Sequence, residues 1–220
     1  PPASPMTTEV FWQGMNDIHT FRIPSATAVN GVVLAFAEAR KVSSADKTPT
    51  MLVLRRSYNG GQSWLAMQTI VDVGNDAAMD PTVVVNKNNG RVLLLFTRYP
   101  YGWNSNITAG TGMDSCTVWL TYSDDEGATW SVPANITAQV KLPQWTSYNL
   151  GPGVGLQTSA WPYSGRLIIP SGHGAVASDP ASGNNHILAS DDGGSTWRIQ
   201  GYISTGSESQ AVELADGVLL

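Results

Sequence analysis

The chain has 220 residues, of which 42% are hydrophobic and only 13% are charged. This length is sufficient for a sizeable core, and the composition excludes an intrinsically disordered protein. The formal net charge of −5 argues against nucleic acid or an anionic membrane surface as the main partner.

Short apolar segments rich in β-branched and aromatic residues recur along the chain, each bounded by Gly, Asn, Asp or Pro. None of them shows an apolar face at the 3.6-residue spacing of a helix, and none has the run of about 18 apolar residues that a membrane span needs. We therefore predict an all-β protein with little or no helix. The predicted strands lie in 31–37, 51–57, 81–85, 91–99, 117–123, 165–172 and 186–190.

One short pattern occurs three times, as SYNGGQSW (57–64), SDDEGATW (123–130) and SDDGGSTW (190–197). All three copies fit S-x-[DN]-x-G-x-[ST]-W, and starting at 57, 123 and 190 they are 66 and 67 residues apart. Each copy follows an apolar segment, which predicts a hairpin turn. In such a turn the Asp or Asn can accept bonds from backbone N–H groups, the Gly can take a positive φ, and the Trp can pack between neighbouring sheets.

This pattern resembles the Asp-box, which occurs in several β-propeller families of different function. The resemblance implies four-stranded sheets arranged around a central channel. It also implies that Asn59, Asp125 and Asp192 are structural rather than catalytic. At about 50 to 65 residues per blade, the chain is expected to supply roughly the first half of a six-bladed β-propeller.

Charged residues at strand ends are the candidates for chemistry. Arg22, in HTFRIPS (19–25), stands in an apolar and β-prone stretch, where it needs either an acidic neighbour or an anion from outside. Glu38 and Arg40 are two residues apart on one predicted strand and therefore face the same way. Asp46 follows in a polar loop that could reach over a pocket, although a loop Asp by itself is most often a turn residue.

Two further acidic residues stand at the start of predicted strands. Asp80 precedes a proline and the segment 82–85, a position typical of a turn. Glu208 stands near the start of SESQAVELADG (207–217), which we predict to be a strand that closes in an Ala-Asp-Gly turn. Glu208 and Glu213 are five residues apart and would face opposite ways, so only one of them can face the channel.

These segments together resemble the sialidases, or exo-α-neuraminidases, in order and spacing along the whole chain. The resemblance is carried by FRIP, by FAEAR with an Asp six residues after its Arg, by the three repeats and by SESQAVELADG. LAFAEARKVSSAD is similar to lysosomal-type animal members, whereas MDPT and the Asn-Ile-Thr after the second repeat are more similar to bacterial secreted members. The family implies retaining hydrolysis of terminal sialic acids from glycoconjugates.

The resemblance also implies a role for each candidate. Arg22 matches one of three arginines that bind the carboxylate of sialic acid, where an Arg–carboxylate pair can be bidentate. Asp46 matches the general acid and base, and Glu208 matches the residue that activates a tyrosine nucleophile. The other matching residues are expected to bind the substrate, around the ring hydroxyls or near the acyl group and aglycone: Arg40, Glu38, Asp80, Tyr101 and Trp103. The segment 151–155 with Gln157 is similar to a further rim loop.

In the family the other two arginines and the tyrosine follow the residue matched by Glu208, so they are expected beyond Leu220. Residues 1–220 are thus expected to be the N-terminal portion of a propeller domain that a C-terminal segment completes. The expected partners are sialylated glycans, including glycoproteins, gangliosides and oligosaccharides. The three histidines have no ligand-like spacing, so neither a metal nor a cofactor is expected.

The expected location is outside the cell or in a lysosome-like lumen. It is suggested by two Asn-Ile-Thr sequons, at Asn106 and Asn135, and by the single cysteine, Cys116, which cannot form an intramolecular disulfide.

Three alternatives remain open. A trans-sialidase would differ by an aromatic acceptor site, to which Tyr101, Trp103 and Trp161 could contribute. A non-catalytic sialic-acid-binding propeller would need the arginines but would have no use for Asp46 or Glu208. A protein-interaction propeller would have no use for the FRIP and EAR motifs.

Overall fold

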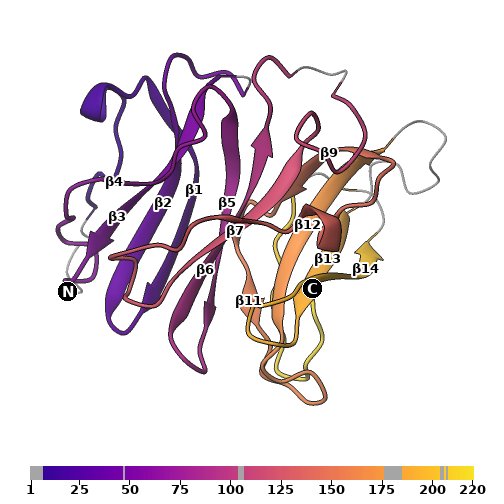
Figure 1. Cartoon of the computed structure of the whole chain (residues 1–220). Coiled ribbons are helices and arrows are strands. Elements are labelled where there is room, and N and C mark those ends of the chain that lie inside the picture. Colours follow the sequence, from indigo (N-terminus) through magenta and orange to yellow (C-terminus); the bar gives the residue numbers. More distant parts are fainter. Residues whose placement is uncertain (1–6, 47, 104–106, 176–184, 204–205, 207) are drawn as a thin grey trace.

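The computed structural model describes residues 7–46, 48–103, 107–175, 185–203, 206 and 208–220 (Figure 1). Helix in this described part is limited to the 3₁₀ turn η1 (Met15–Asp17) and the short helix α1 (Thr137–Val140), so the all-β prediction is confirmed. No helix among these residues is long and apolar enough to cross a membrane. The strands are β1 (Thr20–Val29), β2 (Val32–Arg40), β3 (Thr50–Ser57), β4 (Gln68–Val71), β5 (Ala77–Asn86), β6 (Arg91–Tyr99), β7 (Thr117–Ser123), β8 (Ala134–Asn135), β9 (Trp145–Leu150), β10 (Gly153–Val154), β11 (Leu156–Gln157), β12 (Leu167–Ala175), β13 (Asn185–Ser190) and β14 (Arg198–Ile203).

The strands form two hydrogen-bonded sheets, one of nine strands (β1–β8 and β10) and one of five (β9 and β11–β14). Within these sheets we distinguish three antiparallel units, which lie side by side from the indigo to the yellow end of the chain in Figure 1. The first unit is β1–β4 and the second is β5–β8, each running in sequence order. The third unit contains β11–β14, with β9 paired to β12. All seven predicted strands are present. The prediction missed β1, because Arg22 and Pro24 interrupt its apolar pattern, and the shorter strands β4, β8 to β11 and β14.

The strands β1, β5 and β10, here called the leading strands, meet one another. β10 pairs in parallel with β5 through Gly153 and Thr82. The first two units are also joined where Thr50 of β3 pairs with Ala77 at the start of β5. β1 contacts both β5 and β10. Because the leading strands are neighbours, side chains that are far apart in sequence come together along them.

The three repeated patterns form turns with the same hydrogen bonds. In the third copy, Ser190 Oγ donates to Asp192 Oδ1 and accepts from the backbone N–H of Gly194, each at 2.8 Å. The backbone N–H of Thr196 then donates to Asp192 Oδ1 at 2.9 Å. The copies that begin at Ser57 and Ser123 repeat these bonds. The polar residues of the pattern therefore satisfy the turn itself, as a structural role requires.

In the second and third turns, the final tryptophan packs against the preceding unit. Trp197 is only 4% exposed and lies in the apolar cluster that contains Leu93 of the second unit. Trp130 meets Phe36 of the first unit edge-on, with ring centroids 5.9 Å apart. Trp64 has no earlier unit to cover among the described residues, and its indole N–H donates to Thr8 at 3.1 Å. The second turn thus packs the second unit against the first, and the third turn packs the third unit against the second.

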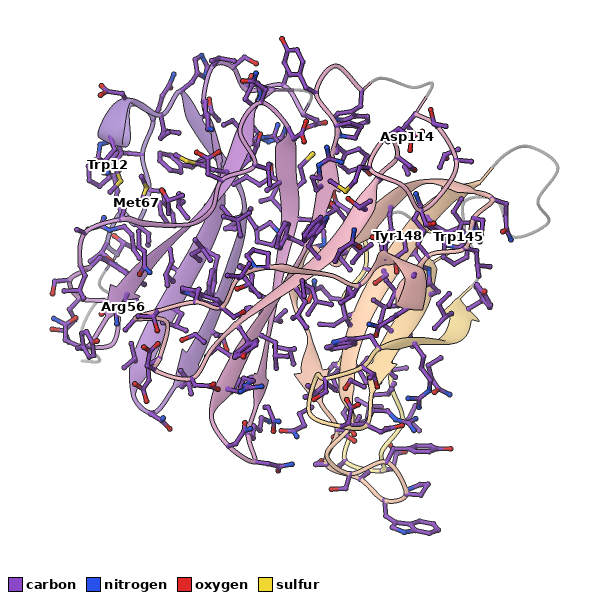
Figure 2. All side chains as sticks on the ribbon, viewed as in Figure 1. Trp12, Arg56, Met67, Asp114, Trp145 and Tyr148 are labelled. Carbon is purple, nitrogen blue, oxygen red and sulfur yellow. The ribbon has the colours of Figure 1, made fainter. Side chains whose placement is uncertain are left out.

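A buried polar network joins three strands of the third unit. His173 Nδ1 and His186 Nδ1 are 3.0 Å apart, and His186 Nε2 is 2.7 Å from the Tyr148 hydroxyl. The rings of Trp145 and His173 are stacked, with centroids 3.5 Å apart and an angle of 9° between their planes. Trp145 and Tyr148 both come from β9 (Figure 2). Burial lowers the pKa of His186 to about 3, and the neighbouring His173 adds to this effect. The two histidines, unrelated by sequence spacing, therefore form one structural pair.

Replacing Gly194 tests the packing of the third turn. Gly194 has φ +98°, and a Cβ there would overlap the buried Leu93 side chain. Gly194→Ala is expected to lower the free energy of unfolding by about 3 kcal/mol, as the sum of a strained positive φ and overpacking. Gly61→Ala is the matched control, because φ is +85° there but the nearest atom to the Cβ is Trp64 at 3.5 Å. The control should cost about 1 kcal/mol, and equal urea midpoints for the two variants would contradict this account.

The histidine pair predicts loss of stability in acid. The unfolded chain binds a proton at His186 near its ordinary pKa of 6.5, whereas the folded chain does so only near about 3. Stability should therefore fall as pH is lowered through this window, by up to about 1.4 kcal/mol per pH unit. His186→Gln should flatten the dependence in urea unfolding, whereas His19→Gln, at an exposed histidine, should leave it unchanged. A wild-type curve as flat as that of His186→Gln would refute the prediction.

Candidate active site

The candidate site begins at two bulges in neighbouring leading strands. The pairing of β1 with β2 shifts between Arg22 and Ser25, and that of β5 with β6 shifts between Met79 and Thr82. At these bulges Ile23 has φ 52° and Asp80 has φ 55°, and each precedes a proline. A positive φ is sterically unfavourable for a β-branched residue, and such strain gathers at functional sites. The bulges also redirect the side chains beside them.

A fully buried ion pair lies between these bulges on β2. Arg40 Nε and Nη2 donate to Glu38 Oε2 at 2.9 and 2.6 Å, and both side chains are at most 1% exposed. The predicted common orientation of the two residues is confirmed. The other oxygen of the glutamate, Oε1, accepts the backbone N–H of Asp80 at 3.0 Å. The pair thus ties β2 to the bulge of β5.

Asp46 bonds the loop 41–46 to the Glu38–Arg40 pair. Its Oδ1 accepts from Arg40 Nη1 at 2.6 Å and from Arg22 Nη1 at 2.9 Å. Arg40 Nη1 also donates to the carbonyl of Ser44 at 2.6 Å. Arg22 therefore does have an acidic neighbour. The Arg22 and Asp46 side chains are nevertheless 45% and 56% exposed, so both remain accessible to a ligand.

The carboxyl of Asp80 is held in an environment that favours its protonated form. Burial raises the pKa of Asp80 well above its usual range, and the charge of Glu38 adds to this rise. The hydroxyl of Thr97 donates a hydrogen bond to Asp80 Oδ2 at 3.1 Å, and this bond partly offsets the rise in the pKa of Asp80. Burial also raises the pKa of Glu38, against the charge of Arg40. A protonated Asp80 could donate a hydrogen bond to a ligand hydroxyl.

Glu208 is exposed and lies beside the segment 151–155. The backbone N–H of the next residue, Ser209, donates to the carbonyl of Gly151 at 2.7 Å, and Gln210 bonds to Pro152. The charge of Glu208 contributes to the raised pKa of Asp80. The strand predicted after Glu208 is present only in part. Residues 209–211 form none, whereas Val212 and Leu220 exchange backbone hydrogen bonds on either side of the predicted Ala-Asp-Gly turn, next to an isolated bridge from Glu213 to Leu219. Before Val212, the chain bonds to the segment 151–155 instead.

Three residues predicted for the pocket or its rim have their contacts elsewhere. The backbone N–H of Tyr101 donates to Asp76 at 2.8 Å, and its side chain is 68% exposed. Trp103 packs on the ring of Tyr99 at 4.2 Å. Gln157 is buried and accepts the backbone N–H of Lys87 at 2.7 Å, so it links the third unit to the β5–β6 turn. None of these contacts brings the three residues to Arg22 or Asp46.

Two contributors to the cluster escaped sequence reasoning. Thr97, the partner of Asp80, is a single polar residue after the apolar run LLLF (93–96), and that interruption is a signal that could have revealed it. Ser44 accepts a hydrogen bond through its backbone carbonyl. Every residue has such a carbonyl, so the sequence does not single out Ser44.

The arrangement suits binding of an anionic ligand with proton transfer nearby. A half-exposed arginine offers donors to an anion, and a carboxyl group stands within hydrogen-bond distance of it. Among the residues that the structure describes, no group of three or more His, Cys, Asp or Glu side chains could hold a metal ion.

Comparison with known proteins finds a matching domain family and several similar proteins. The BNR repeat-like domain matches residues 31–219. A Bacteroides fragilis sialidase is 32% identical over 94% of this chain and 40% of its own length. Rat Sialidase-3 is 30% identical over 90% of this chain and 50% of its own length, so the chain spans about half the length of the curated relatives it matches.

A solved structure agrees with these sequence matches. The Hadza microbial sialidase Hz136 superposes with a TM-score of 0.83 and 28% identity, over 94% of this chain and 42% of its own. The all-β units therefore have the arrangement found in a sialidase, and the resemblance drawn from the sequence motifs is confirmed. The chain belongs to the BNR repeat-like domain family, and the curated relatives named above are sialidases.

Proposed function

We propose that this chain forms part of an exo-α-sialidase that removes terminal sialic acids from glycoconjugates with retention of configuration. The observation that carries the proposal is the contact between the half-exposed Arg22 and Asp46, held on the buried Glu38–Arg40 pair. Sialic acid carries a carboxylate next to the bond that is broken. An arginine that binds this group, with a carboxyl group beside it, can both orient the sugar and protonate the leaving oxygen.

Each residue has a role in this mechanism. Arg22 binds the substrate carboxylate, and Asp46 is the general acid for departure of the aglycone and then the base that activates water. Glu208 takes the proton of a tyrosine nucleophile as it attacks. A neutral phenol avoids the repulsion that a carboxylate nucleophile would meet from the substrate carboxylate attached to the anomeric carbon, and tyrosine is an established nucleophile in sialidases. Asp80 faces the ring hydroxyls, and the buried Glu38 and Arg40 support Asp80 and Asp46 through their hydrogen bonds.

The remaining parts of the site are proposed to come from the rest of a six-bladed propeller. The three turns with shared hydrogen bonds and the regular spacing of the units support blades with Asp-boxes. The chain spans about half the length of its curated relatives, which is consistent with a further segment that supplies the tyrosine and two arginines. Sialylated glycans are then the substrates.

The roles of Asp46 and Arg22 predict different responses to the leaving group. In the complete enzyme, Asp46→Ala should slow hydrolysis of a natural sialyl oligosaccharide by about 10²–10⁴-fold, because the sugar leaving group needs a proton. Hydrolysis of an activated fluorescent phenyl α-sialoside should fall by less than about tenfold, because the phenol leaves readily as an anion. Arg22→Ala should impair both substrates. The measurement is kcat/KM for the two substrates.

Asp124→Ala is the control for these variants, because Asp124 bonds to Arg91 in a turn outside the site and its loss should change neither rate. Equal losses with both substrates in Asp46→Ala would remove the acid role. Binding of sialic acid through Arg22 without any turnover by the wild type would instead indicate a non-catalytic sialic-acid-binding propeller.

Glu208 should behave differently from Asp46. Its proposed role is in nucleophilic attack, which both substrates require. Glu208→Gln is therefore expected to lower kcat for the natural and the activated substrate by a similar factor, about 10²-fold or more. Selective loss of the natural substrate alone would assign Glu208 to leaving-group chemistry and contradict the proposal.

A further inference from the structure

The connection between β11 and β12 is longer than the equivalent connections in the first two units. Residues 30–31 connect β1 to β2 and residues 87–90 connect β5 to β6, whereas residues 158–166 connect β11 to β12. The three connections thus have two, four and nine residues. A surface loop longer than its structure requires is a common location of a binding function. Residues 158–166 are here called the hairpin tip.

The hairpin tip lies at the far end of the strands from the candidate active site. Gln157 Oε1 accepts the backbone N–H of Lys87 at 2.7 Å, which places the tip beside the turn that follows β5. Asp80 stands near the start of β5, roughly 20 Å away along the strand. In Figure 1 the loop 41–46 is at the upper end of the strands and the β11–β12 hairpin is at the lower end. Trp161, within the tip, is therefore too distant to form an acceptor site beside the catalytic residues.

The tip exposes two aromatic side chains although its backbone is firmly held. Trp161 is 90% exposed and Tyr163 is 54% exposed. The carboxylate of Glu213 accepts from the backbone N–H groups of residues 159–160 at 2.7 and 3.0 Å. The guanidinium of Arg166 lies 3.9 Å from the centroid of the Tyr163 ring. A ligand that covers the indole of such a fixed loop therefore pays little to order it.

Two hollows flank the exposed aromatic residues. One, of about 490 Å³, lies between the tip and the turn at Asn88. The other, of about 250 Å³, contains Trp161 and lies between the tip and the C-terminal segment at Asp216. Tyr163 and Arg166 line both hollows. The tip thus combines an aromatic surface with a few polar groups, which is the usual composition of a site for a small molecule.

The charges around the tip favour an uncharged ligand. One cation and three carboxylates line the two hollows: Arg166, Asp191, Glu213 and Asp216. Arg166 Nε and Nη2 both donate to Asp191, at 2.6 and 3.2 Å. Arg198 and Lys87 approach these carboxylates from outside the hollows, and even with them the cations do not outnumber the carboxylates. An anionic sugar would therefore meet no excess of positive charge here.

We propose that the hairpin tip is a second, non-catalytic glycan-binding site for neutral pyranose sugars such as galactose, with Trp161 as the surface on which the sugar stacks. A pyranose ring has C–H bonds on its faces and hydroxyl groups around its edge. The C–H face covers the indole and removes apolar area from water. The hydroxyl groups bond to polar side chains that line the hollows, among them Asn88 and Asp216. This site goes beyond the function proposed above and does not depend on it.

Lactose, a neutral disaccharide that ends in galactose, is the probe for this site. Its binding to the complete enzyme is measured by saturation-transfer NMR over a range of lactose concentrations that gives Kd. The wild type should bind lactose, and Trp161→Ala should raise Kd about tenfold, because the stacked ring is lost. Trp161→Tyr, which keeps an aromatic surface, should raise it less. Both variants should keep the wild-type kcat/KM for an activated α-sialoside, because the tip is distant from the catalytic residues.

Trp12→Ala is the matched control. Trp12 is also an exposed tryptophan, at 46%, but it lies beside Arg55 of β3, so its loss should leave the Kd for lactose unchanged. The free energy of unfolding of Trp161→Ala should stay within about 0.5 kcal/mol of the wild type, as expected for an exposed side chain.

Three results would overturn the second site. The first is an unchanged Kd for lactose in Trp161→Ala, and the second is Trp161-dependent binding of free sialic acid that is tighter than that of lactose. The third is a loss of stability above about 1 kcal/mol in Trp161→Ala, because it would mean that another segment of the protein covers the indole. A wild type that cleaves sialosides without binding lactose would also refute this site, and it would leave the proposed function intact.

Discussion

The candidate site depends on the buried ion pair between Glu38 and Arg40. Two charges removed from water are unfavourable unless their hydrogen-bonding groups are satisfied, and here the bonds that satisfy them reach outward. Glu38 accepts from the backbone of β5, and Arg40 donates to the 41–46 loop. The requirement to satisfy a buried pair therefore organises both the second unit and the loop that carries Asp46. Removal of Arg40 would leave the Glu38 carboxylate as an uncompensated charge in the interior.

Much of this could be predicted from the sequence, because the informative features are local. Alternation on one strand places Glu38 and Arg40 on the same side, and the repeated turn carries its own hydrogen-bonding groups. Such features depend on residues a few positions apart. The strands they delimit were correspondingly predicted well.

The remainder depends on contacts that close over long distances in sequence. Arg22 meets Asp46 only after β1 and β2 have paired, and β1 itself was missed because its polar residues stand at a bulge. Glu208 approaches Asp80 only because Ser209 and Gln210 bond to the segment that follows β9. His173 and His186 likewise meet across paired strands. No period or motif encodes these meetings, because they follow from strand pairing and loop contacts between residues far apart in the sequence.

The tryptophans of the second and third turns each pack against the unit that precedes them in the chain. Trp130 covers the first unit and Trp197 covers the second, so each unit receives part of its apolar cover from the residues synthesised after it. During translation, a completed unit offers the surface onto which the next turn can dock as it emerges from the ribosome. The chain can then grow from its N-terminus by successive addition, and each addition withdraws from water an apolar surface that would otherwise be open to aggregation.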